Sequence, residues 1–143
     1  MDKNQILKEF SADPDRYYKV KLFEEQGFIK GYHADVDSRA LGFEVQVFAM
    51  VGLQSQAEVD LRQFEELCQG WPLVRECHML NGEVDFMLKC VAPDLSSFQS
   101  FLTGELLTAS NVGSVKTSLV IRAEKDEPGV PFNILEDRLS KRP

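Results

Sequence analysis

The feature that most constrains the fold is a pattern that occurs twice, in residues 43–80 and again in residues 84–122. Each half begins with an apolar run typical of a strand, continues with a helix whose apolar stripe contains phenylalanine, and ends with a second strand. The pattern predicts strands over residues 43–53, 73–80, 83–91 and 114–124, and helices over residues 56–69 and 95–107. This order predicts an α+β protein with a ferredoxin-like βαββαβ sandwich.

The first strand, residues 43–53, is apolar on one whole face and partly apolar on the other. Short right-handed crossovers place both helices on one face of the sheet, so the second face is left bare. Phe48 and Met50 should point to that second face. An apolar sheet face of this kind predicts self-association, with Phe48 and Met50 in the dimer face.

An Asn81-Gly82 pair joins the two halves. Because both central positions of a type I′ turn need positive φ, the pair predicts a tight hairpin, with Glu83 and Asp85 on one side of the next strand. Carboxylates there can accept hydrogen bonds from an ammonium group, and the turn amides can donate hydrogen bonds to a carboxylate. These are the two charged groups of a free amino acid. The predicted binding segment is Leu80, Asn81, Gly82, Glu83 and Asp85; a plain hairpin with solvated acids is the alternative.

A short helical segment precedes this domain. A helix is predicted over residues 13–26, capped by Asp13 and ended by Gly27. Residues 126–143 contain three of the six prolines and are expected either to pack or to be disordered. Packing would use Val130, Phe132, Ile134 and Leu135. The expected division is therefore residues 1–40, residues 41–125 and residues 126–143.

Charge and cysteine content limit the classes of function that we expect for this protein. With 16 Lys and Arg against 23 Asp and Glu, the net charge is −7, so DNA binding would need a local basic patch. No signal peptide and no membrane-length apolar run occurs, and the three cysteines form no CxxC pair. We expect a cytoplasmic protein with buried, reduced thiols, no metal site and no membrane contact.

The sequence contains no catalytic signature. Its two histidines, His33 and His78, are not spaced as metal ligands, and no GxSxG, GxGxxG or Walker loop is present. We therefore expect no catalytic residue and no cofactor, and the function is expected to be binding.

A series of short segments resembles the Lrp/AsnC family of bacterial and archaeal regulators: FIKGY from residue 28, LG from 41, VRECH from 74, GEVDFML from 82 and VAPDL from 91. The resemblance implies that residues 42–125 are an effector-sensing RAM domain. It implies dimers formed through the bare sheet face, assembly into tetramers or octamers, and an amino-acid effector bound between dimers. The family's Gly-x-x-Asp motif corresponds to Gly82 and Asp85.

The N-terminal segment departs from the family pattern. These regulators carry a helix-turn-helix domain of about fifty residues, and two adjacent helices are the minimum for reading DNA, whereas only 26 residues precede Gly27 here. Residues 1–34 hold six basic and six acidic residues. We therefore expect DNA binding to be reduced or lost, with weak contacts at Arg16, Lys19 and Lys21.

Two alternatives remain open. The chain could be a stand-alone interaction module that hetero-oligomerises with full-length relatives and needs no ligand. It could also be an enzyme like the sirohaem decarboxylases, which resemble this family in fold and carry Arg and His around the corresponding hairpin. Only His78 is present in that segment here.

Overall fold

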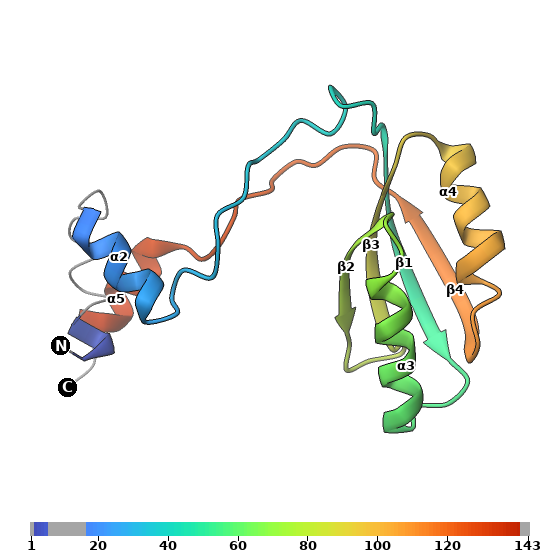
Figure 1. The fold of residues 1–143 in the computed structure, drawn as a ribbon, viewed down its shortest axis with the longest axis horizontal. Coiled ribbons are helices and arrows are strands. Elements are labelled where there is room, and N and C mark those ends of the chain that lie inside the picture. The colour runs from blue at the N-terminus through green and yellow to red at the C-terminus, as the bar shows by residue number, and fades with distance from the viewer. Residues whose placement is uncertain (1, 6–16, 141–143) are drawn as a thin grey trace. The chain divides into compact units, whose positions relative to one another are not determined.

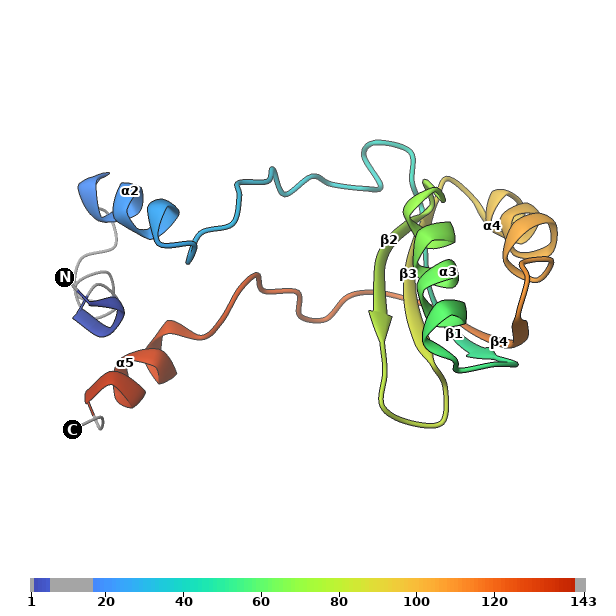
Figure 2. The ribbon, with the colours of Figure 1, turned by 60° about the horizontal axis from the view of Figure 1, so that its bottom comes forward.

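A four-stranded antiparallel sheet forms the centre of residues 36–124 in the computed structural model, which describes residues 2–5 and 17–140 (Figure 1). Its strands are β1 (Val45–Leu53), β2 (Val74–Met79), β3 (Phe86–Ala92) and β4 (Val112–Leu119), in the spatial order β2-β3-β1-β4. The helices α3 (Glu58–Gln69) and α4 (Leu95–Phe101) cover one face (Figure 2). The predicted βαββαβ order is confirmed.

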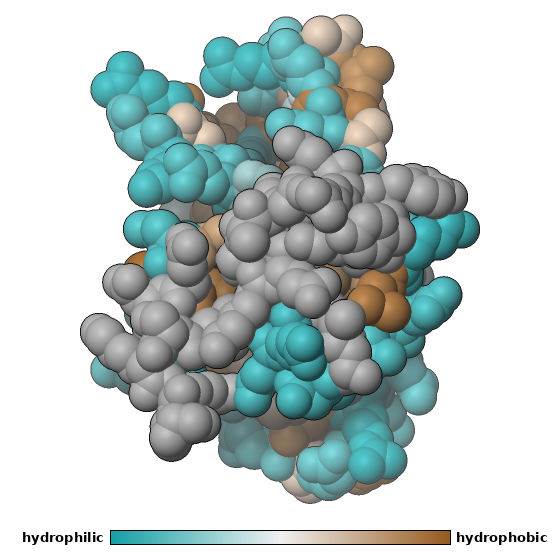
Figure 3. Space-filling model, turned by 90° about the vertical axis from the view of Figure 1, so that its left-hand side faces the viewer, coloured by the Kyte–Doolittle hydropathy of each residue, from teal (hydrophilic) through white to brown (hydrophobic). Residues whose placement is uncertain are grey.

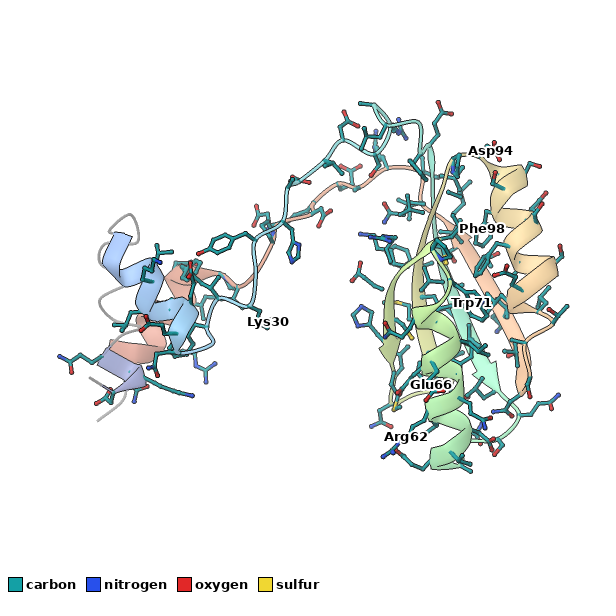
Figure 4. The ribbon with its side chains drawn as sticks, viewed as in Figure 1. Lys30, Arg62, Glu66, Trp71, Asp94 and Phe98 are labelled. Carbon is teal, nitrogen blue, oxygen red and sulfur yellow. The ribbon has the colours of Figure 1, made fainter. Side chains whose placement is uncertain are left out.

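The core lies between the helices and one face of the sheet. Alternate residues of β1 and β3 point into it, because successive side chains of a strand face opposite ways. The rings of Phe64 on α3 and Phe86 on β3 are 4.8 Å apart, and Trp71 meets Phe101 edge to face at 5.4 Å. In Figure 4, Phe98 points into this layer.

The second helix of the sheet unit begins where the sequence predicts. The Asp94 carboxylate accepts a hydrogen bond from the Ser97 backbone N–H at 2.6 Å, which caps α4. The helix then widens into a π turn, η1 (Leu102–Leu106), where the Leu107 N–H donates to the Leu102 carbonyl. A regular α-helix to residue 107 was therefore wrong. The wider turn lets Phe101 and Leu106, five positions apart, both be buried.

The Asn81-Gly82 pair does not form the predicted type I′ turn. Neither residue has a positive φ, and the Leu80 N–H donates to the Asp85 carbonyl across a four-residue loop, residues 81–84. The strand β3 begins at Phe86, not at residue 83, so Glu83 and Asp85 do not alternate along a strand. Asp85 also bonds to β1, because its N–H donates to the Val51 carbonyl at 2.9 Å, a contact distant in sequence.

Other predicted boundaries shift by a few residues. Strand β4 spans Val112–Leu119 instead of residues 114–124, and α3 starts at Glu58 without a side-chain cap. Leu67 on α3 and Leu95 on α4, although apolar, are 40% and 48% exposed. Both lie near helix ends, where the stripe runs past the edge of the core.

Residues 1–35 and 125–143 form a second compact unit. Its helix α2 (Tyr17–Glu25) ends as predicted at Gly27, whose φ is +78°, with the Phe28 N–H donating to the Phe23 carbonyl at 2.9 Å. The predicted cap Asp13 lies outside the described residues. The described surface visible in Figure 3 is mostly hydrophilic, with separate hydrophobic residues.

The C-terminal segment contains a helix, α5 (Phe132–Ser140), which the sequence did not predict. Four apolar residues of this segment were expected to pack if the segment is ordered. Val130, Phe132 and Ile134 are each at least half exposed, and only Leu135 is half-buried. No helix among the described residues is long and apolar enough to span a membrane.

Candidate functional site

The predicted binding segment splits into an exposed part and an anchored part. Asn81, Gly82 and Glu83 are exposed in the loop, whereas Leu80 and Asp85 are half-buried at its two ends. A Cβ added at Gly82 would meet no atom within 4 Å, so crowding does not require glycine there. The backbone of residues 81–83 is therefore open to a ligand.

Asp85 connects the loop to the end of β1. Its carboxylate accepts hydrogen bonds from the Leu53 N–H at 2.7 Å and from the Gln56 side-chain amide at 3.4 Å. The Asp85 N–H donates to the Val51 carbonyl at 2.9 Å. These bonds hold the carboxylate in place. An ionised carboxylate has about four acceptor positions, so two donors leave capacity for another.

A second connection, which the sequence did not predict, is made by Asn111. Its side-chain oxygen accepts from the Ser55 N–H at 2.7 Å, and its amide donates to the Ser55 carbonyl at 2.9 Å. Its φ of +71° is a left-handed conformation that asparagine tolerates better than most residues. The sequence signal that could have marked this place is that Asn111 and Gly113 are residue types favoured in turns.

Three loops therefore meet at one end of the sheet: residues 53–57, 80–85 and 109–113, here called the loop end. Asp85 joins the first loop to the second, and Asn111 joins the first to the third. The Ser55 hydroxyl also donates to the Asp60 carboxylate at 2.6 Å, which ties the start of α3 to the same place. The loop end is preorganised by hydrogen bonds and presents exposed backbone at residues 81–83.

The sheet face away from the helices, here called the open face, has an apolar centre. Met50 pairs with Met87 of β3 and Lys116 of β4, and Phe48 pairs with Lys89 and Ser118. Phe48 and Met50 are half-buried, as are Met87 and Val91. The predicted dimer-face residues thus lie together on one surface.

Charged groups border that centre on β2 and β3. The Glu76 carboxylate lies 3.1 Å from the His78 ring nitrogen and 3.2 Å from the Lys89 ammonium. The hydrogen bond to His78, followed by the contact with Lys89, holds the pKa of the Glu76 carboxyl below its usual value, although partial burial opposes this. His78 is thus hydrogen-bonded to the Glu76–Lys89 ion pair on the sheet.

An apolar hollow of about 440 Å³ adjoins the open face at the start of β1. Its apolar lining includes Leu41 and Phe43 from the segment before β1, and Leu73 and Val91 from the sheet. Leu41 is 62% exposed and Phe43 is 40% exposed. The apolar surface therefore continues beyond Phe48 and Met50.

The cysteines differ from the expectation in one respect. Cys68 and Cys90 are buried, but Cys77 on β2 is half-exposed. Burial raises the pKa of the Cys90 thiol to about 11. Among the described residues, no group of three or more His, Cys, Asp or Glu side chains could hold a metal ion.

The predicted DNA-contacting residues cannot be placed as a set. Arg16 and the side chain of Lys19 lie outside the described residues. Lys21 is exposed on α2. The weak DNA contact therefore stays a prediction.

Comparisons with known proteins agree on a family. Residues 46–130 match the family model described as the Lrp/AsnC ligand binding domain. The leucine-responsive regulatory protein of Rhizobium meliloti is 46% identical over 108 residues, which are 76% of this chain and 69% of that protein. The transcriptional regulator AzlB of Bacillus subtilis is 34% identical over 115 residues, 80% of this chain and 73% of its own.

Solved structures show the same fold. A transcriptional regulator from Neisseria meningitidis, solved in complex with L-Met, superposes with a TM-score of 0.77 at 24% identity, covering 94% of this chain and 99% of that one. The AsnC structure from E. coli gives a TM-score of 0.73 at 19% identity, covering 92% and 99%.

Proposed function

Because this chain belongs to the Lrp/AsnC family of transcriptional regulators, we propose that its sheet unit senses an amino acid at the loop end, between dimers. The observation that carries the proposal is the anchored Asp85 carboxylate beside the exposed backbone of residues 81–83. The Neisseria relative, which was solved with L-Met, supports an amino acid as the ligand class.

The two charges of a free amino acid fit the two parts of the loop end. Backbone N–H groups in the 81–83 segment can donate to the ligand carboxylate. The Asp85 carboxylate, with Glu83 nearby in the chain, can accept from its ammonium group. Because Asp85 is already held by the Leu53 N–H, its carboxylate loses little further freedom when a ligand binds.

The proposed dimer forms through the open face. Its apolar centre at Phe48 and Met50, and the apolar hollow beside it, would be buried by a second copy in an isologous contact. Two such dimers would then meet at their loop ends. Tetramers or octamers of this kind would place the ligand between dimers.

Relatives are named as transcriptional regulators, so we propose a regulatory role for this chain as well. Residues 1–34 have equal numbers of basic and acidic residues, six of each. This balance supports weak DNA contact, because affinity for the phosphate backbone requires an excess of Lys and Arg. A gel-shift at low salt with the gene's own upstream DNA tests this role, and absence of binding rejects it.

The sensing role is tested with thermal unfolding of the full chain against a panel of the twenty amino acids. We expect one or a few to raise Tm. Asp85→Asn should abolish the rise while leaving the fold intact, because an amide oxygen can still accept from the Leu53 N–H. Glu66→Gln is the matched control on the exposed side of α3 (Figure 4) and should retain the response.

A flat response across the panel, with the oligomer intact by light scattering, would reject amino-acid sensing. The alternative function, a stand-alone interaction module that needs no ligand, would then explain the protein better. An unchanged response in Asp85→Asn would reject Asp85 as the ammonium acceptor.

A further inference from the structure

Two of the three cysteines lie next to each other although they come from different elements. Cys68 is in the last turn of α3 and Cys77 is on β2. The two thiols are close enough to affect each other's pKa, and both cysteines line one hollow of about 290 Å³ together with Trp71 and Pro72. Since Cys77 is half-exposed and lines the hollow, a small molecule can reach its thiol, next to which Cys68 is buried.

The two thiols are not equivalent. Cys68 is buried and Cys77 is half-exposed. The neighbouring Cys68 thiol lowers the pKa of Cys77, although burial and the Glu65 carboxylate oppose this, and Cys77 in turn raises the pKa of Cys68. Cys77 is therefore the accessible sulfur with more thiolate character, which is the reactive form of cysteine.

We propose that Cys68 and Cys77 form a peroxide-sensitive thiol pair that oxidises to an intramolecular disulfide. Hydrogen peroxide or a small organic hydroperoxide is the oxidant. The pair is separate from the loop end, and the proposal does not depend on amino-acid sensing.

The chemistry has two steps. The Cys77 thiolate attacks one peroxide oxygen, the O–O bond breaks, and the leaving hydroxide takes up a proton to become water, so that Cys77 becomes a sulfenic acid. The Cys68 sulfur, losing its proton, then attacks the Cys77 sulfur, the S–O bond breaks and a second water leaves. Two thiols and one hydrogen peroxide thus give one disulfide and two waters.

Cys90 provides an internal control. It is buried on β3, paired across the strands with Val74, and its thiol is kept protonated by burial. Trypsin cleaves after Arg62, Arg75, Lys89 and Lys116. The three cysteines therefore fall in three different peptides, 63–75, 76–89 and 90–116. Each possible disulfide therefore gives a different pair of peptides.

The test oxidises the reduced full chain with hydrogen peroxide, blocks remaining thiols with iodoacetamide under denaturing conditions, and maps tryptic peptides without reductant. We expect peptide 63–75 joined to 76–89, released by dithiothreitol, with Cys90 recovered alkylated. Cys90→Ser should give the same cross-link. Cys68→Ser should instead leave a sulfenic acid on Cys77 that dimedone traps, and Cys77→Ser should give neither product.

Three results would overturn the proposal. They are a cross-link that includes peptide 90–116, a cross-link between two chains, and recovery of Cys77 as free thiol or sulfinic acid without any disulfide. A separate measurement tests the effect of Cys68 on the pKa of Cys77. In the wild-type chain iodoacetamide should modify Cys77 faster than Cys68 or Cys90, and Cys68→Ala should slow that modification. An unchanged rate of Cys77 modification in Cys68→Ala would show that Cys68 does not increase the reactivity of Cys77.

Discussion

The two faces of the sheet are built from the same strands but have different chemistry. On the helix-covered face, Val47, Ala49, Val51 and Leu88 are at most 2% exposed. On the open face, Phe48 and Met50 are half-buried, and charged groups of β2 and β3 surround them. Alternation along a strand thus lets one segment serve the core with one set of side chains and the proposed dimer face with the other.

From this difference between the two faces we predict which substitutions should destabilise the fold and which should change the assembly. Side chains between sheet and helices contribute through burial and close packing. Side chains on the open face contribute little to the fold of a single chain, and they decide what can pair with it. Four substitutions test this comparison, in order of expected effect.

Phe64→Ala should have the largest effect. Phe64 is 1% exposed and its ring contacts Phe86 and Trp71, so truncation removes buried apolar area and leaves a cavity. The expected loss is about 3–5 kcal/mol of unfolding free energy, measured by urea denaturation. Val59→Ala on the same helix is the control. Its side chain is 61% exposed, so the change should stay within about 0.5 kcal/mol.

Met50→Glu should separate assembly from folding. A carboxylate in the apolar centre of the open face would be buried on dimerisation without a partner. We expect the dissociation constant from sedimentation equilibrium to rise at least about tenfold, equal to about 1.4 kcal/mol. Val59→Glu, on the exposed side of α3, should leave it unchanged. Equal dissociation constants for both variants would contradict the proposed dimer face.

Asp94→Ala tests a cap on the helix-covered side. The carboxylate accepts from the Ser97 N–H, and this bond holds the pKa of Asp94 below its usual value. Loss of the cap should lower Tm by a few degrees. The pKa of Asp94 is lower in the folded state than in the unfolded state. The stabilisation of the fold by the ionised cap is therefore complete above the unfolded-state pKa and disappears as pH falls through the folded-state pKa. The Tm gap between wild type and variant should close on acidification.

Glu76→Gln should have the smallest effect. Its side chain is 46% exposed, so solvent screens its ion pair with Lys89 and its hydrogen bond with His78, and the expected loss is below about 0.5 kcal/mol. The pKa of Glu76 is also lowered in the fold, so this contribution is present above the unfolded-state value and is lost at lower pH. The measurement is urea denaturation with and without 1 M salt, a concentration at which screening is about complete. The difference in unfolding free energy between wild type and variant should be smaller in salt.

Much of the fold was predictable because local signals agreed with it. Gly27 and Asp94 mark a helix end and a helix start through their own backbone and side-chain chemistry. The alternation in β1 placed Phe48 and Met50 on the face opposite the core. The candidate segment around Asp85 was chosen from its residue types and spacing and stays a prediction, and its loop geometry was not foreseen.

The errors share a cause, which is a contact distant in sequence that overrides a local preference. The Asn81-Gly82 pair favours a tight turn, but Asp85 bonds to Leu53, 32 positions earlier, and the loop widens. Asn111 was expected only as part of a turn, because its partner Ser55 is 56 positions away. Neither bond leaves a periodic pattern that a reader of the sequence could recognise.

The sequence by itself determined the order of elements, the two-sided first strand and the family segments, because these depend on periodicity and on residues close along the chain. Only the tertiary structure decided that η1 follows α4, that three loops meet at the loop end, and that Cys68 lies beside Cys77. Those features depend on how α3, β1 and β2 pack. Packing brings together side chains whose separation along the chain carries no local signal.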